Sequence, residues 1–259
     1  TFEHEGNADE PTYGFDKVIM LAGGVGYARR SDAQKGTPEP GEEVVLLGGD
    51  NYRIGMGGGA VSSVNTGQYA GAIELNAVQR SNPEMQKRVE NVIRTLSESE
   101  DNPIISIHDH GAGGHLNCLS ELVETTGGHF DLSAFPIGDE TLSSKEIIGN
   151  ESQERMGLLV KGDAVERIAR IAERERAPMY VVGHTTDDMH LTFEEAGGDK
   201  PIDLALSDMF GSAPKTYMVD KHIDKTYLAL SYDAARVEHY LDEVLQQEGV
   251  ACKDWLTNK

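Results

Sequence analysis

Residues 104–117 read IISIHDHGAGGHLN. The β-branched apolar run at the start predicts a buried strand that ends at Asp109, and the small residues after it predict a tight turn. An amphipathic segment begins near Leu116, so we expect the turn to open a helix. A helix N-terminus attracts an anion, glycines let the backbone approach it, and a carboxylate can ligate a divalent cation. The stretch therefore predicts a phosphate site with Asp109 as the metal ligand, although an aspartate here could instead cap the helix.

The overall composition limits the classes of partner. The 259 residues can form one large domain or two small ones, and 23 basic against 44 acidic residues leave a net charge of −21. Such a charge argues against the nucleic-acid backbone as a partner. No apolar run approaches the roughly 18 residues that a membrane span needs. Cys118 and Cys252 have neither metal nor redox spacing, so we expect a cytoplasmic protein. Together with the charge and the lack of a long apolar run, this predicts a protein that binds neither nucleic acid nor membrane.

The two ends of the sequence differ from its middle. The chain starts at Thr1 rather than at a methionine, and both ends are polar and unpatterned, which predicts a piece of a longer protein. We expect a compact domain at residues 16–215, with residues 1–15 as the remnant of a preceding domain. Residues 216–259 would form a linker and a helix that lead toward a further domain. The apolar spacing of that helix is set by Val237, Tyr240, Leu241, Val244 and Leu245.

Strand and helix patterns alternate along the central part of the chain. Strands are predicted at residues 17–22, 43–47, from 104, and at 129–132, 155–160, 179–182 and 190–193. Asn82 and Pro83 form the N-cap and first position of a helix whose apolar face carries Met85, Val89, Val92, Ile93 and Leu96. A further helix at residues 163–176 is expected to bury Val165, Ile168, Ala169 and Ala172. This alternation predicts an α/β fold in which helices cover both faces of a sheet.

Two further stretches carry candidate binding residues. Glu151, Ser152 and Gln153 precede a predicted strand and offer acceptors and donors for a polyhydroxyl or amide ligand, although a plain loop would be equally polar. Gln79 is a weaker, isolated candidate. Gly57, Gly58 and Gly59 either let the backbone approach a phosphate or simply form a turn that needs positive φ.

Other chemistries find less support in the sequence. His108, His110 and His115 lie near Cys118, but their spacing fits no zinc motif, and consecutive strand positions point to opposite faces. The chain has no GxxxxGK[ST] loop and no GxSxG nucleophile motif. Composition and spacing by themselves therefore reach an acidic α/β domain with a phosphate and Mg²⁺ site.

Several runs, taken together and in this order, resemble the phosphoribosylformylglycinamidine synthase (formylglycinamide ribonucleotide amidotransferase) family. They are IMLAGG at 19–24, GMGGGA at 55–60, VQRSNPEM at 78–85, HDHGAGG at 108–114, NESQER at 150–155 and RERAP at 174–178. The resemblance covers about residues 16–215, and RSNPEM looks like the large, single-chain form of the enzyme. It implies the layered α-β-α fold (α+β) with a mixed sheet that is found in the C-terminal domain of aminoimidazole ribonucleotide synthetase. This chain would be the first of two such repeated domains.

The resemblance also implies an activity. The family is an ATP- and Mg²⁺-dependent ligase of purine biosynthesis, which converts formylglycinamide ribonucleotide, ATP and glutamine to formylglycinamidine ribonucleotide, ADP, phosphate and glutamate. By this likeness Asp109 would ligate Mg²⁺, while Gln79, Glu151, Ser152 and Gln153 would bind the ribonucleotide. The ATP phosphates would lie on the glycine turns, at Gly57, Gly58 and Gly59 and at Gly111, Gly113 and Gly114.

The family's catalytic histidine belongs to a His-Asn-His-Pro motif, which this sequence lacks, as it lacks the glutaminase Cys-His-Glu triad. The chain alone is therefore expected to be inactive. Its partners would be the preceding catalytic domain, the second repeat and the glutaminase domain. Two alternatives remain: a noncatalytic nucleotide-binding or packing module, and a related aminoimidazole ribonucleotide or selenophosphate synthetase domain.

Overall fold

The structure is a computed structural model of the chain. It describes residues 2–4, 13–15, 23–62, 64, 67–77, 81–111, 113–151, 154–211, 214–215, 217, 229–247 and 250. The chain divides into two compact units, Thr1–Ser212 and Ala213–Lys259. The strand predicted at residues 17–22 lies outside the described residues.

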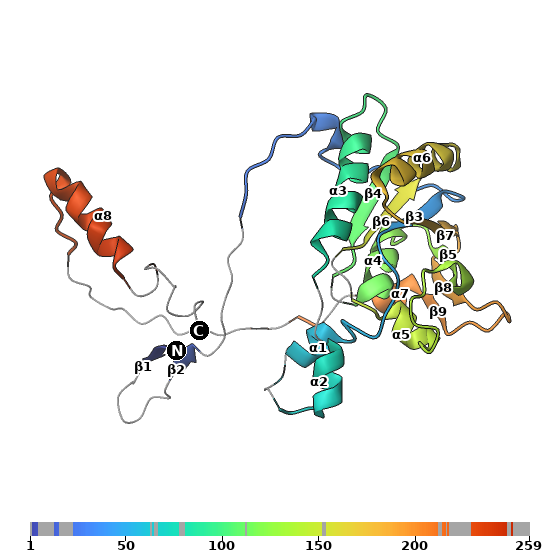
Figure 1. Ribbon diagram of the computed structural model, residues 1–259, viewed down its shortest axis with the longest axis horizontal. Coiled ribbons are helices and arrows are strands. Elements are labelled where there is room, and N and C mark those ends of the chain that lie inside the picture. Colours follow the sequence, from blue (N-terminus) through green and yellow to red (C-terminus); the bar gives the residue numbers. More distant parts are fainter. Residues whose placement is uncertain are drawn as a thin grey trace. The chain divides into compact units, whose positions relative to one another are not determined.

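The described strands are β1 (Phe2–His4), β2 (Tyr13–Phe15), β3 (Glu43–Leu47), β4 (Ile104–Asp109), β5 (Gly128–Asp131), β6 (Met156–Val160), β7 (Met179–Thr185), β8 (His190–Glu194) and β9 (Ile202–Ala205). The α-helices are α1 (Gly58–Ser62), α2 (Gly71–Ala77), α3 (Pro83–Ser97), α4 (Gly114–Leu122), α5 (Ser144–Ile148), α6 (Val165–Glu175), α7 (Leu206–Met209) and α8 (Val237–Leu245) (Figure 1). Apart from the one outside the described residues, each predicted strand of the central part is present, within a few residues of its predicted ends.

A seven-stranded mixed sheet organises the first unit. Its strand order is β4-β6-β3-β7-β5-β8-β9, while β1 and β2 pair with each other in a separate antiparallel sheet. Within the larger sheet β5 and β8 run parallel, and the other described pairs are antiparallel. The predicted layered fold with a mixed sheet is therefore confirmed. The sequence had not indicated β9, a short edge strand in which Asp203 and Leu204 are exposed.

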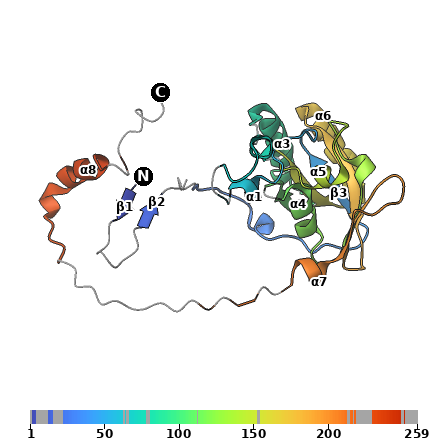
Figure 2. The same cartoon turned by 90° about the horizontal axis from the view of Figure 1, so that it is seen from below.

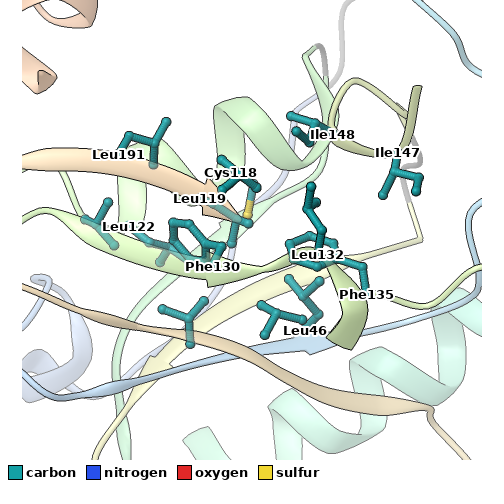
Figure 3. Packing of buried hydrophobic residues seen from close by; sticks show 14 of the residues in the cluster. Leu46, Cys118, Leu119, Leu122, Phe130, Leu132, Phe135, Ile147, Ile148 and Leu191 are labelled. Carbon is teal, nitrogen blue, oxygen red and sulfur yellow. The ribbon is translucent and has the colours of Figure 1, made fainter. Parts of the chain in front are cut away.

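One face of the sheet packs against α4, α5 and α7. Its core is built around Leu119 and Leu122 of α4 and Phe130 of β5, each 1% exposed or less (Figure 3). Side chains from β3, β6, β7 and β8 complete this cluster. Because strand residues alternate between faces, Val44 and Leu46 of β3 point into this layer.

The opposite face packs against α3 and α6, and Figure 2 shows these two helices side by side, with α4 across the sheet from them. Val45 and Leu47 of β3 meet apolar residues of both helices here. The predicted face of α3 is confirmed, because Val89, Val92 and Leu96 are buried and Met85 and Ile93 pack beside them. The predicted burial of Ala169 in α6 is wrong. Ala169 is exposed because it lies about 100° around the helix from Ile168, which faces the core.

The start of α3 follows the local rule for helix N-termini. The Asn82 side chain accepts a hydrogen bond from the Met85 amide at 3.1 Å, and Pro83 occupies the first helical turn. This arrangement satisfies one of the amides that a helix leaves without an internal partner. The cap predicted from the sequence is confirmed.

In the second unit the predicted helix is present as α8, on which Val237 and Leu241 are exposed. No helix of the described residues is long and apolar enough to cross a membrane.

Truncation of a core side chain should show how strongly the α4 layer stabilises the first unit. We expect Leu119→Ala to lower the free energy of unfolding by about 2–5 kcal/mol, because Leu119 is 0% exposed and its removal leaves a cavity. Leu204→Ala is the matched control, since Leu204 on β9 is 43% exposed, and it should change stability by less than about 1 kcal/mol. Chemical denaturation measures both. Equal losses in the two variants would contradict the assignment of the core.

Candidate functional site

The carboxylate of Glu151 joins the two glycine turns. It accepts hydrogen bonds from the backbone amide of Gly59, at 3.3 Å, and from that of Gly113, at 3.2 Å, and Glu151 is only 6% exposed. Gly59 lies in the first turn of α1, and Gly113 is the N-cap of α4. Partial positive charge at helix N-termini favours such an anion. The structure thus brings together residues more than 90 positions apart in sequence around one buried carboxylate.

The glycines in these turns serve different purposes. Gly57 has a φ of +62°, and a Cβ on it would meet nothing within 4 Å, so it supplies a backbone turn. At Gly58 a Cβ would lie 2.9 Å from a Glu151 carboxylate oxygen, so its role is close approach to an anion. The turn reading is therefore confirmed at Gly57, while Gly58 approaches a carboxylate and the phosphate reading of this cluster stays a prediction.

The turn before α4 is controlled by the segment that contains Asn150. Gly114 has a φ of +60°, and a Cβ on it would lie 2.4 Å from the carbonyl oxygen of Asn150. Gly114 is thus required by contact with another backbone segment, which the glycine pattern in the sequence does not reveal. Gly113, with a φ of +86°, caps α4 without a side-chain hydrogen bond. The alternative in which Asp109 caps this helix is therefore wrong.

Asp109 lies exposed at the end of β4, beside the same turn. Its Oδ2 atom would lie 3.2 Å from a Cβ on Gly111, so its carboxylate faces the glycine turn. Among the residues that the structure describes, no three His, Cys, Asp or Glu side chains form a group that could hold a metal ion. Mg²⁺ is commonly held by one or two carboxylates together with water and substrate phosphates. Asp109 fits that minimal role, in which the bound phosphates would supply further ligands.

A buried polar network, which the sequence analysis did not assign, holds the loop at residues 49–56. Arg155 is 2% exposed and donates hydrogen bonds to the Gly49 carbonyl at 2.8 Å, the Asp50 carbonyl at 2.6 Å and the Asn150 side-chain oxygen at 2.8 Å. The Asn150 amide group donates in turn to the carbonyls of Tyr52 and Ile54, at 2.6 and 2.7 Å. Burial lowers the pKa of Arg155 to about 10, so the guanidinium remains charged at neutral pH. The available signal was that a long, polar run, NESQER, directly precedes a buried strand.

Two histidines are buried next to this network. His110 and His115 are both 0% exposed, and their rings meet edge to face with centroids 4.7 Å apart. The Nε2 atom of His115 lies 3.2 Å from the Asn51 side-chain oxygen, whereas the other ring nitrogens of the pair have no hydrogen-bond partner among the described residues. Burial and the nearby Arg155 charge lower the pKa of His110 to about 3. Burial, reinforced by His110 and Arg155, also lowers the pKa of His115 well below its usual range.

The structure does not bring these histidines together with His108 as a metal centre. His108 instead pairs with Glu121, with 2.8 Å between Nδ1 and Oε2, and with Lys35. The zinc interpretation of the histidine run therefore finds no support in the described residues.

A pocket of about 420 Å³ lies beside the network. Its lining includes Asp50 and Tyr52 from the loop, Ser81 and Asn82 from the start of α3, and Glu154. The predicted ligands Gln79, Ser152 and Gln153 lie outside the described residues, but in sequence they flank Ser81 and Glu154. A larger pocket, of about 640 Å³, lies along β4 and residues 31–36 and contains none of the predicted site residues.

Alanine substitutions in the turn before α4 should show which glycine is required by the backbone conformation and by its close contacts. We expect Gly114→Ala to destabilise the first unit by at least about 1–2 kcal/mol, because an L residue is strained at positive φ and the new methyl group would overlap the Asn150 backbone. Gly111→Ala is the control in the same turn. There the new methyl group meets only the carboxylate of the exposed Asp109 side chain, which can rotate away, so stability should change little. Thermal unfolding that is equally affected by both substitutions would argue against this account.

The buried histidine pair predicts a dependence of stability on pH. A base whose pKa is lowered in the folded state takes up a proton more readily when unfolded, so stability is retained above about pH 6.5 and lost as the pH falls below it. The slope should approach about 1.4 kcal/mol per pH unit for each such histidine. His115→Leu should make the slope between pH 6.5 and 4.5 shallower, because this histidine is fully buried. Denaturation at a series of pH values gives both slopes, and identical slopes in wild type and His115→Leu would refute the prediction.

Comparison with known proteins places the fold. The family model described as "AIR synthase related protein, C-terminal domain" matches residues 39–195, which is more than half of the chain. Among solved structures, Thermotoga maritima PurL complexed with FGAR is similar, with 24% identity and a TM-score of 0.66 over 80% of this chain and 35% of that one. Phosphoribosylformylglycinamidine synthase II from Thermotoga maritima gives 22% identity and a TM-score of 0.60, over 74% of this chain and 30% of that one. T. maritima PurL complexed with ATP has 20% identity and a TM-score of 0.53, over 80% of this chain and 33% of that one.

These structural likenesses, all below 25% identity, show a shared fold. The chain spans only about a third of the length of those structures. The family match includes both the α4 turn and the segment that carries Glu151 and Arg155. The chain therefore belongs to the AIR synthase-related family, of which it contains the C-terminal domain.

Proposed function

We propose that this chain is the part of a phosphoribosylformylglycinamidine synthase of the large, single-chain form that binds Mg²⁺-ATP and the ribonucleotide substrate. The whole enzyme would convert formylglycinamide ribonucleotide, ATP and glutamine to formylglycinamidine ribonucleotide, ADP, phosphate and glutamate. The single observation that carries the proposal is the Glu151 carboxylate, which is held by amides from two separate glycine turns. The ordered motif resemblance and the solved complexes of T. maritima PurL with FGAR and with ATP supply the choice of ligands.

The electrostatics of the two turns support a phosphate site. A carboxylate and a phosphate both accept hydrogen bonds from backbone amides and both gain from a helix N-terminus. Glu151 therefore demonstrates that this place accommodates an anion despite the net charge of −21. In the proposed complex the ATP phosphates use the turns that contain Gly57, Gly58 and Gly59 and Gly111, Gly113 and Gly114. Since Glu151 now engages the Gly59 and Gly113 amides, its carboxylate must turn away when a phosphate takes those donors, and it then becomes available to the ribonucleotide.

Asp109 is proposed as the protein ligand of the Mg²⁺ ion. Its exposed carboxylate lies at the mouth of the α4 turn, so a cation held there could also contact a phosphate on that turn. When bound, the ion would neutralise charge on the transferring phosphoryl group. The remainder of the reaction needs groups that this sequence lacks, so we propose that the chain is inactive alone and acts with a preceding catalytic domain, a second repeat and a glutaminase domain.

The pocket of about 420 Å³ is proposed as part of the ribonucleotide site. It is of a size suited to a small ligand, and its lining combines apolar side chains with polar groups that can both donate and accept. Gln79, Ser152 and Gln153 are proposed to complete it from the neighbouring sequence positions, together with Glu151. The cytoplasmic location expected from the composition stays a prediction.

Removal of the Asp109 charge tests the Mg²⁺ assignment. In the full-length parent enzyme we expect Asp109→Asn to keep the fold, because the two side chains have the same shape, and to lower ammonia-dependent activity at least about 100-fold, because the phosphoryl group loses its counter-charge. Asp131→Asn is the control, since Asp131 ends β5 and caps the short turn at Leu132–Ala134, which asparagine can also do. Wild-type activity of Asp109→Asn at limiting Mg²⁺ would exclude the assignment.

Truncation of Gln153 tests the ribonucleotide assignment. In the full-length enzyme, Gln153→Ala should raise the KM for the ribonucleotide roughly ten- to a hundredfold, because one hydrogen-bonding partner of the substrate is lost. The glutaminase half-reaction should proceed at its normal rate. Gln86→Ala, which truncates the same side chain on the exposed surface of α3, should leave the KM unchanged. An unchanged KM in a folded Gln153→Ala enzyme would mean that this loop serves the structure alone.

A further inference from the structure

We infer that Arg155 is a positioning residue for the anion site, acting through Asn150 to hold residues 49–56 in the conformation that presents the glycine turn after them. The ligand of the site rests on the proposed function, whereas the geometry of the loop rests on the contacts described above. Arg155 itself touches neither Gly59 nor Gly113 through any hydrogen bond of the described residues. Its effect on the site is therefore indirect.

The first step concerns the start of the loop. Two of the guanidinium nitrogens donate to consecutive carbonyls, those of Gly49 and Asp50. Gly48, immediately before them, has a φ of +128°, and a Cβ there would lie 2.9 Å from Cγ of Arg155. The backbone thus leaves β3 in direct contact with the Arg155 side chain. These contacts fix where the loop departs from the sheet.

The second step concerns the middle and end of the loop. The third guanidinium nitrogen holds the Asn150 side-chain oxygen, which orients the Asn150 amide group toward the carbonyls of Tyr52 and Ile54. The amide of Glu151 then donates to the Gly55 carbonyl at 3.0 Å. Five carbonyls of one irregular loop therefore accept hydrogen bonds from three residues, Arg155, Asn150 and Glu151. Gly57 begins the turn two residues later.

The third step concerns the choice of side chain. Arginine presents its donors in one rigid plane, which suits several acceptors at once, whereas lysine carries a single rotatable ammonium group. Among the described residues Arg155 forms no direct salt bridge, although the nearby carboxylates of Glu154 and Asp50 favour its charge. Burial of a charge without a direct ion pair is unfavourable. A planar set of donors toward this loop accounts for a buried arginine here, and a neutral apolar residue could not replace it.

The experiment compares Arg155→Lys and Asn150→Asp with the wild-type chain. Arg155→Lys keeps the charge and loses the planar donors, whereas Asn150→Asp keeps the acceptor for Arg155 and loses the two donations to Tyr52 and Ile54. Arg167→Lys is the matched control, because Arg167 on α6 also binds a backbone carbonyl, that of Asp101, far from the loop. Amide hydrogen exchange reports on residues 49–59, and calorimetric titration with Mg²⁺-ATP reports on the anion site.

We expect both site variants to speed exchange at residues 49–59 by at least about tenfold while exchange in α3 and α6 stays as in wild type, and to weaken Mg²⁺-ATP binding by at least about tenfold. Arg167→Lys should change neither. Unchanged exchange at residues 49–59, uniform acceleration across the whole first unit, or wild-type Mg²⁺-ATP affinity in a folded variant would overturn the inference. If Arg155→Lys does not fold, Asn150→Asp decides by the same criteria. A wild-type chain without Mg²⁺-ATP binding would count against the proposed function, and a local change in exchange would then still support the positioning of the loop.

Discussion

The irregular loop between β3 and α1 places backbone carbonyls in the protein interior, where each needs a hydrogen-bond donor. Regular structure does not supply these donors, because in the part of the chain that the structure describes the loop takes part in no strand and forms isolated bridges at Asn51 and Met56. Arg155, directly before β6, and Asn150, five residues earlier, supply them instead. Both glycine turns depend on this arrangement, since Gly114 lies against the Asn150 backbone and Glu151 links Gly59 to Gly113.

The same region shows how an acidic protein can hold an anion. With a net charge of −21 the chain repels anions at long range. The carboxylate of Glu151 is nevertheless held by backbone amides at short range, because amide dipoles at helix N-termini act over the first turn and need no lysine or arginine side chain. The charge of the buried Arg155 acts on the neighbouring histidines, where together with burial it lowers the pKa values of His110 and His115.

Much of the fold followed from local sequence rules. In the strand Glu43–Leu47 the four residues after Glu43 form an unbroken apolar run, and they are buried on both faces of an interior strand, as such runs usually are. The Asn82 cap and the buried face of α3 depend on residues at most a few turns apart, so the pattern was sufficient. The burial of Ala169 was predicted wrongly and β9 was not predicted, because burial at the border of a helix face and pairing at the edge of a sheet depend on neighbours from distant parts of the chain.

In the candidate site, too, some features follow from local sequence and others from the tertiary structure. The sequence by itself determined the elements that carry it: a strand ending at Asp109, a glycine turn, a helix, and a polar run before β6. Only the tertiary structure decided that Gly113 rather than Asp109 caps α4 and that the Asn150 backbone leaves no room for a side chain at Gly114. It also decided that Arg155 donates hydrogen bonds to the loop after β3. Local patterns record the conformational preference of each segment. Hydrogen bonds between residues about 100 positions apart form only when folding buries both partners. Once water is excluded, each buried donor or acceptor needs the other as its partner.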